Sequence, residues 1–149
     1  VSRGVLFIEA KPIQRVQEVP LLIGKNALFP GVCVEAAVIL RTDAEKFSSV
    51  HKKFTDSVLD YDIIREYARL HTRTPGLRML PAGKTHHVSV KKWLNECVPP
   101  AKRQQVHFLS DADGLLWVEG LGTAAHAAVT AQTQRMLVLR VHRINTDCT

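Results

Sequence analysis

The apolar residues of this chain occur in short runs, and within the first 41 residues the gaps between neighbouring runs are too short for parallel crossovers. Val32 to Leu40 follows the Pro30-Gly31 dipeptide, which favours a turn. Val106 to Leu109 and Leu115 to Val118 flank a hairpin turn at residues 111–114. A parallel connection needs about a dozen residues or more, so these runs predict antiparallel strands.

An amphipathic stripe predicts one short helix in the second half of the chain. The apolar residues that recur at helical spacing after Ser89 are Val90, Trp93, Leu94 and Cys97. The lysines of this segment lie off the stripe. Residues 99–100 are both proline and end the helix, because proline lacks the amide proton and restricts the residue before it.

Weaker patterns complete the expected elements. Residues 42–45 have the T-x-x-E spacing of a capping box and predict a short helix that reaches Phe54. Residues 62–68 predict one or two helical turns, residues 24–26 a turn, and residues 123–132 a loop or frayed helix. Further strands are expected at residues 5–8, 19–23, 58–61, 68–72 and 136–141.

Together these elements predict an α+β fold. We expect a small antiparallel or mixed sheet with one or two short helices, preceded by a β-rich N-terminal stretch. The expected division is a β-rich N-terminal part at residues 1–55, the main domain at 56–145 and a tail at 146–149. A length of 149 residues and a hydrophobic fraction of 46% suit one compact domain with an N-terminal appendage.

The composition also bounds the location. No apolar run approaches the roughly 18 to 20 residues that span a bilayer, and the N-terminus lacks a basic-then-apolar signal arrangement. The cysteines are odd in number and far apart, which fits a reducing compartment better than a disulfide framework (Cys33, Cys97, Cys148). We therefore expect a cytoplasmic protein with no membrane partner.

The excess positive charge of the chain lies in a single segment. Between residues 73 and 103 there are seven basic residues and one acidic residue, Glu96, and this excess equals the net charge of +6 of the whole chain. Charge concentrated in this way indicates a polyanion partner, and an RNA phosphate backbone is the best candidate. The candidate RNA-binding residues are Arg73, Arg78, Lys84, Lys91, Lys92, Lys102 and Arg103.

Each of these residues also has a structural alternative. An arginine beside the turn at residues 75–76 can fork onto phosphates, or it can pair with a nearby acid such as Asp60. Lys91 and Lys92 follow the expected helix start, where free amide protons favour anions, but a solvated helix face is the other interpretation. Trp93 and Trp117 are expected to pack in the core and not to serve as base-stacking platforms.

The sequence offers no self-contained active site and no recognisable metal site. Four histidines invite a metal hypothesis, but the adjacent pair cannot easily both face one ion and no zinc spacing is present (His71, His86, His87, His107). Asp60 and Asp62 lack a neighbouring nucleophile or metal frame, so turn formation and charge pairing explain them better. We expect no catalytic residue, no metal ligand and no cofactor in this chain.

Four stretches between Leu59 and Gly122 follow one another in a specific order. They are LDYD at 59–62, HTRTPG at 71–76, VKKWL at 90–94 with VP at 98–99, and DGLLWVEGLG at 113–122. By this order and spacing the span resembles the C-terminal domain of tRNA(Ile)-lysidine synthetase. Residues 1–55 are only vaguely similar to the region upstream of that domain.

The resemblance implies a role in RNA recognition. Members of that family have an N-terminal domain with an S-G-G-x-D-S phosphate loop, which uses ATP with Mg²⁺ to activate the wobble cytidine of an isoleucine tRNA for attack by lysine. Their C-terminal domain is implied to hold the acceptor stem. This sequence contains no S-G-G-x-D-S motif. The expected partners are therefore the tRNA(Ile) acceptor stem and a catalytic domain of the same protein, with a homodimer possible through the parent.

The sequence departs from the family pattern in three places. Leu77 stands where an acidic residue is usual, and His86-His87 occupies a stretch that is commonly Gly, Ser or Lys. His107 replaces a frequent proline. These changes affect the individual RNA contacts and not the expected fold.

Two functional hypotheses follow. In the first, the chain is an accessory domain that holds the acceptor stem by shape and phosphate contacts and does no chemistry. In the second, it is an intramolecular scaffold or dimerisation domain whose basic segment faces an acidic protein surface.

Overall fold

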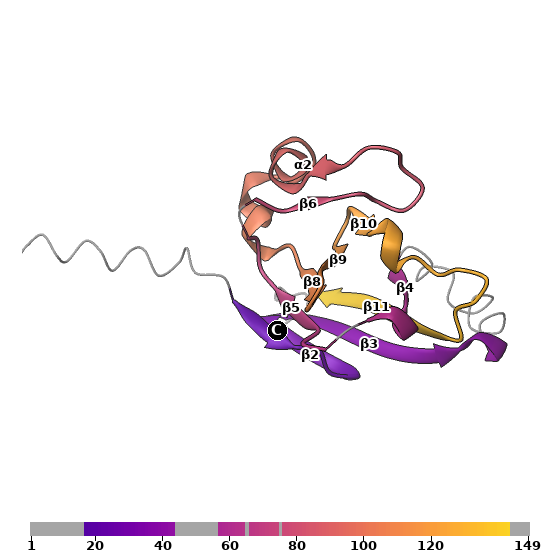
Figure 1. Cartoon of the computed structure of the whole chain (residues 1–149). Coiled ribbons are helices and arrows are strands. Elements are labelled where there is room, and N and C mark those ends of the chain that lie inside the picture. The colour runs from indigo at the N-terminus through magenta and orange to yellow at the C-terminus, as the bar shows by residue number, and fades with distance from the viewer. Residues whose placement is uncertain (1–16, 44–56, 65, 75, 144–149) are drawn as a thin grey trace, which may run out of the picture.

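The two ends of the described chain are joined by one long strand pairing. The protein is represented by a computed structural model that describes residues 17–43, 57–64, 66–74 and 76–143. Strand β3 (Val32–Leu40) lies antiparallel to strand β11 (Arg135–Arg143) along its whole length. Because every residue of one strand has a partner in the other, the first and last described segments form one sheet (Figure 1).

Two shorter strands complete this sheet of four. Strand β2 (Gly24–Phe29) pairs with β3, and strand β4 (Val58–Asp60) pairs with β11, both antiparallel, in the order β2-β3-β11-β4. Gly31, in the turn between β2 and β3, has a φ of +78°, a left-handed conformation that glycine adopts without steric cost. The predicted turn at Pro30-Gly31 and the strand after it are confirmed.

A second sheet holds five strands, and all its neighbouring pairs are antiparallel. The predicted hairpin is confirmed, with its turn at residues 112–113, although its first strand begins at Phe108 and not at Val106. In sheet order, the strands are β1 (Glu18–Pro20), β5 (Arg69–His71), β8 (Phe108–Asp111), β9 (Gly114–Val118) and β10 (Gly122–Thr123).

A two-stranded hairpin leads directly into the α-helix. Strands β6 (Arg78–Met79) and β7 (Val88–Ser89) pair, and helix α2 (Val90–Cys97) begins at the next residue. Figure 1 shows α2 and β6 at the top of the molecule, on the side opposite β2 and β3. The described residues also form short 3-10 helices, which are η2 (Arg41–Asp43), η4 (Tyr61–Ile63), η5 (Pro100–Gln105) and η6 (Ala125–Ala127).

Both larger sheets and α2 contribute to one hydrophobic core. Each fully buried large apolar side chain contributes about 1.5–3 kcal/mol to folding. The largest of them are Leu59, Leu70, Leu94, Phe108, Leu109, Leu116, Trp117, Leu137 and Leu139. Antiparallel sheets packed with a short helix confirm the predicted α+β class.

The turn predicted at residues 24–26 is wrong, because these residues begin strand β2. The reversal lies just before them and is held by the side chain of Asn26. Its Oδ1 accepts from the amide of Leu22 at 2.8 Å, and its Nδ2 donates to the carbonyl oxygens of Leu22 and Val34 at 2.9 and 3.1 Å. A turn-forming residue type therefore acts here from within the strand, through its buried amide.

The predicted apolar stripe of α2 is correct at Val90 and Leu94 but wrong at Cys97, which is exposed. Cys97 is the last residue of the helix. The chain turns out of the helix at Val98, whose amide donates to the Leu94 carbonyl, and Val98 packs against the core instead. The helix is therefore too short for a fourth inward position.

Several other predictions lie outside or at the edge of the described residues. Four predictions fall outside the described residues, wholly or in large part. They are the strand at residues 5–8, the helix up to Phe54, the boundary between residues 55 and 56, and the tail at 146–149. The one or two helical turns predicted at residues 62–68 are present only as η4. The strands predicted at 58–61, 68–72 and 136–141 are confirmed as β4, β5 and β11.

His71 is buried within the five-stranded sheet in its neutral form. Its Nδ1–H donates to the Thr72 carbonyl at 2.8 Å, its Nε2 accepts from the Ser110 hydroxyl at 2.7 Å, and its ring stacks on Phe108. Burial lowers the pKa of His71 below its ordinary value of 6.5, and the hydrogen bond to Thr72 only partly offsets this. Protonation would thus place a charge in the core.

We expect His71 to make the fold sensitive to acid. Below pH 6.5 the unfolded chain takes up a proton at this position before the folded chain does, so stability falls as pH decreases through this range. In urea unfolding between pH 7 and pH 5, the variant His71→Gln should lose less stability than the wild type. The exposed-site variant His126→Gln should keep the wild-type pH dependence. Parallel curves for wild type and His71→Gln would contradict this assignment.

A substitution at Leu137 tests the packing of the four-stranded sheet. It is fully buried in β11 and lies between Val38 of β3 and Leu59 of β4. The change Leu137→Ala should lower the free energy of unfolding by about 2–5 kcal/mol, because it leaves a cavity in the core. Leu40→Ala at the 53%-exposed end of β3 should cost less than about 1 kcal/mol in the same denaturation measurement. Equal losses would show that β11 is not a core strand.

Candidate nucleic-acid interface

Helix α2 begins at a side-chain cap that follows directly from the hairpin. The Ser89 hydroxyl accepts from the amide of Lys92 at 3.3 Å, as an N-cap residue does. The amide of Val90 donates to the Leu77 carbonyl at 3.1 Å, which ties the helix start to β6. Arg78 pairs across the hairpin with Ser89, so the arginine lies beside the first turn of the helix.

A depression of about 280 Å³ lies beside the N-terminal part of α2. Val90 and Leu94 are buried and supply apolar walls, while Arg73 and Lys91 are cationic. Arg73 follows strand β5, so the fold joins two cations that are eighteen positions apart in the sequence. The residues that line the depression are Arg73, Thr74, Gly76, Val90, Lys91 and Leu94.

Six of the seven predicted cations form no ion pair and no side-chain hydrogen bond with the described residues. Among described residues the ion pairs use other arginines and histidines, and Asp60 accepts instead from the amide of Asp62. The alternative in which an arginine pairs with Asp60 is therefore not found. Arg73 is half-buried, and the other five are exposed: Arg78, Lys84, Lys91, Lys92 and Lys102.

Arg103 differs from the other six, because its guanidinium binds the end of α2. Its Nε donates to the carbonyls of Leu94 and Val98 at 2.9 and 2.8 Å, and its Nη2 donates to the Asn95 carbonyl at 2.9 Å. The Leu94 carbonyl also accepts from the Val98 amide, while the carbonyls of Asn95 and Val98 lie at the helix end, where helical partners run out. A cation at this end also interacts favourably with the negative end of the helix dipole. Arg103 therefore fixes the helix that carries Lys91 and Lys92.

The tip of the β6–β7 hairpin carries exposed basic and imidazole groups. Lys84 closes a turn in which its amide donates to the Pro81 carbonyl at 3.0 Å, and Gly83 in this turn has a φ of +80°. His86 and His87 follow, both exposed. The hairpin therefore extends the basic surface beyond the helix.

The two tryptophans pack inward. Trp117 is 2% exposed in β9, so its predicted place in the core is confirmed. Trp93 is half-buried and packs against the core beside Gly120, where an added Cβ would lie 3.4 Å from the indole.

The sequence did not predict a polar cluster around the buried side chain of His107. His107 is fully buried and its Nδ1 lies 2.9 Å from Oε1 of Glu119, whose Oε2 binds Nη2 of Arg143 at 2.7 Å. Burial is the largest influence on Glu119 and raises its pKa, yet the hydrogen bonds from His107 and Arg143 together lower it. Its members lie far apart in the sequence, so no local pattern indicates the cluster.

The described residues hold no group of three or more His, Cys, Asp or Glu side chains placed to bind a metal ion. Asp62 is used structurally: it accepts from the amide of Gln134 and from Nε of Arg135, both at 2.8 Å, and these bonds lower its pKa. Among all the described residues, no helix has the length and apolar character needed to span a membrane.

Comparison with known protein sequences gives two matches. A family model described as the TilS substrate C-terminal domain matches residues 68–141. The tRNA(Ile)-lysidine synthase of Geobacter sulfurreducens is 37% identical over 68 residues, which are 45% of this chain. The match spans only 14% of that protein's length.

Two solved structures share the architecture. The crystal structure of a TilS C-terminal domain matches with a TM-score of 0.67 at 23% identity, over 88% of this chain and 99% of the other. An N-terminal fragment of the phenylalanyl-tRNA synthetase beta-subunit from Pyrococcus horikoshii matches with a TM-score of 0.50 at 13% identity. That match covers 89% of this chain and 48% of the other.

The antiparallel sheets, the short helix and the basic hairpin define a small α+β domain that presents cations around one helix start. Within that class, residues 68–141 match the family of TilS C-terminal domains. The family resemblance predicted from residues 59–122 is thereby confirmed.

Arg103 provides a test of how the helix is held. The change Arg103→Ala removes three hydrogen bonds to carbonyls and should lower the free energy of unfolding by about 1–2 kcal/mol. Arg103→Lys should recover little of it, because an ammonium group cannot reproduce the planar fork. Lys102→Ala, at the exposed neighbour, should change stability by less than about 0.5 kcal/mol in the same urea titration. Equal effects at both positions would contradict the cap.

Proposed function

We propose that this domain binds the acceptor stem of an isoleucine tRNA for a tRNA(Ile)-lysidine synthase and does no chemistry itself. The observation that carries the proposal is the depression at the start of α2, whose lining residues include Arg73 and Lys91 and no acidic residue. A phosphate placed there would gain two charges beside the N-terminal end of a helix.

The arrangement of the other cations supports a duplex more than a small anion. Arg78 and Lys92 flank the same helix start, and Lys84 lies farther along the hairpin. Cations spread over a helix and a hairpin suit several phosphates of one backbone. An A-form stem is recognised mainly in this way, by its shape and its phosphates, since its deep groove is closed to side chains.

The six cations and Arg103 have different roles in this proposal. Lys91, Lys92, Arg73, Arg78, Lys84 and Lys102 contact phosphates, while Arg103 positions the helix that carries two of them. The loss of Arg103 would then weaken RNA binding indirectly, through movement of α2.

The activity belongs to the whole protein in this proposal. The parent would be the ATP-dependent enzyme that attaches lysine to the wobble cytidine, with ATP and Mg²⁺ held by a separate catalytic domain. The name of the Geobacter sulfurreducens relative supports this assignment. The catalytic domain, and in a homodimer a second copy, are the proposed protein partners, and the cytoplasm is the proposed location.

A second candidate function rests on an exposed apolar site. Leu22 and Ile23, which connect β1 and β2, are 61% and 56% exposed. Neighbouring exposed apolar residues of this kind suit a protein contact. In this alternative the domain is a scaffold that fixes the catalytic domain and makes no RNA contact.

Charge reversal separates the two functions. Lys91→Glu or Lys92→Glu should weaken binding of the AUA-decoding isoleucine tRNA by at least about tenfold, since a hydrogen bond to a charged group contributes about 1.5–3 kcal/mol and about 1.4 kcal/mol is tenfold in affinity. Lys25→Glu, on β2, makes the same change in net charge far from α2 and should have a much smaller effect. Binding is measured by gel shift at several salt concentrations.

The salt dependence gives a second readout from the same experiment. The logarithm of the affinity should fall linearly with the logarithm of salt concentration. Each phosphate contact that a variant loses should make this slope shallower by about one. Lys91→Gln and Lys92→Gln should therefore have shallower slopes than the wild type. Unchanged affinity and slope in all these variants would favour the scaffold.

A further inference from the structure

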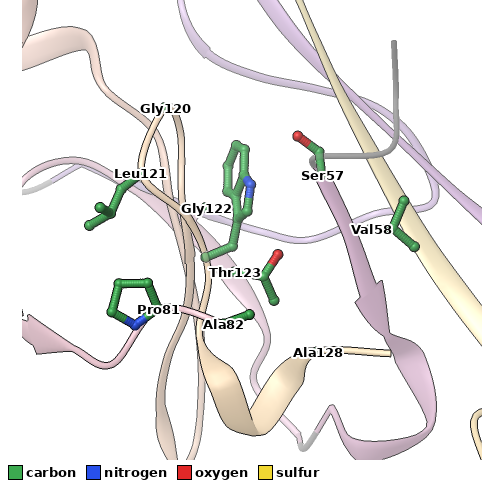
Figure 2. A pocket seen from close by; sticks show the side chains of 10 residues that line it. Ser57, Val58, Pro81, Ala82, Gly120, Leu121, Gly122, Thr123 and Ala128 are labelled. Atoms are coloured by element: carbon green, nitrogen blue, oxygen red, sulfur yellow. The ribbon is translucent and has the colours of Figure 1, made fainter. Parts of the chain in front are cut away.

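A second cavity, of about 450 Å³, lies between the turn after β6 and the connection of β9 to β10. Its volume is in the range of small-ligand pockets. Figure 2 shows Pro81 and Leu121 on one side and Ser57 and Val58 on the other, with Thr123 between them. The remaining lining residues are Ala82, Trp117, Gly120, Gly122 and Ala128.

The cavity is lined by uncharged residues and its surface is more polar than apolar, with one polar group that has no partner. None of the residues that line it is charged. Thr123 is 8% exposed, and its hydroxyl Oγ1 is buried without a hydrogen-bond partner among the described residues. A buried hydroxyl without a partner costs on the order of 1–3 kcal/mol, so a group that bonds to it would stabilise the site.

The cavity is connected to the basic surface through two of its walls. Pro81 and Ala82 belong to the turn that Lys84 closes, because the Lys84 amide donates to the Pro81 carbonyl. Gly120, on another wall, lies against Trp93 of α2, the helix that carries Lys91 and Lys92. The cavity therefore shares walls with the two elements that carry these lysines.

We infer that this cavity takes one unpaired nucleobase of the bound RNA. The inference rests on the proposed function, because it places the phosphates of the same strand on Lys84 and the neighbouring cations. A base is flat, largely apolar on its faces and polar at its edge. Pro81 and Leu121 would contact its faces, and the Thr123 hydroxyl would bond to its edge as donor or acceptor.

A neutral base fits this cavity better than a charged group. A phosphate or carboxylate inside it would lose its hydration and find no cation among the lining residues. Outside the cavity an anion has a cation nearby in sequence, since Lys84 is exposed in the same turn as Pro81 and Ala82. The division of charge therefore suits a nucleotide whose base enters and whose phosphate stays at the surface.

The test compares two RNA probes that differ by one base. Both are hairpin stems with a single unpaired 3′ nucleotide, which in the second probe is abasic and so retains its phosphate and sugar. The full chain should bind the probe with the base at least about fivefold more tightly, as expected for one base contact. With 2-aminopurine as the unpaired base, its fluorescence should change when the protein binds.

Two variants locate the base. Ala82→Leu narrows the mouth from an exposed position and should abolish both the fivefold preference and the fluorescence change, while the affinity for the abasic probe is unchanged. Ala112→Leu, at the exposed turn of the β8–β9 hairpin, is the matched control and should behave as the wild type. Thr123→Val keeps the shape of the side chain and should reduce discrimination among the four bases.

The possible outcomes separate this inference from the proposed function. Equal affinity of the wild type for both probes would overturn the inference and leave the stem-binding function standing. A preference for the base that survives in both Ala82→Leu and Thr123→Val would also overturn it, since the base would bind elsewhere. If neither probe bound in a salt-dependent way, the proposed function itself would fail.

Discussion

The basic surface depends on how helix α2 packs on the core and how its two ends are capped. An eight-residue helix has no appreciable stability alone in water, because nucleation costs more than so few hydrogen bonds return. Here Val90 and Leu94 bury one side of it, Ser89 caps its start and Arg103 binds its last carbonyls. The positions of Lys91 and Lys92 are therefore consequences of packing and capping.

The support for that helix comes from sequence-distant segments. The sheet that holds β3 and β11 pairs the first described segment of the chain with the last one. Both larger sheets bury residues in the same core as Leu94. Strand β3 lies before residue 68, where the matched family region begins, yet it pairs with β11 along its whole length. The family region thus shares its core with the preceding segment of this chain.

The sequence predicts those features that depend on local pattern. The hairpin at residues 111–114, the strand at 32–40 and the inward Val90 and Leu94 follow from spacing of apolar and turn-forming residues. What it did not predict depends on long-range side-chain bonds. Arg103 has the same composition signal as a phosphate-binding arginine, and only the folded chain shows its guanidinium on three carbonyls.

The central claim is that RNA phosphates bind where α2 begins, and an NMR titration tests it most directly. A ¹⁵N-labelled sample of the chain is titrated with a hairpin of the isoleucine tRNA acceptor stem at moderate salt. The account predicts that the largest amide shift changes lie at Gly76 and at residues 90–92, with little change along β2. Shift changes concentrated on β2 and β3, or none at all, would contradict it.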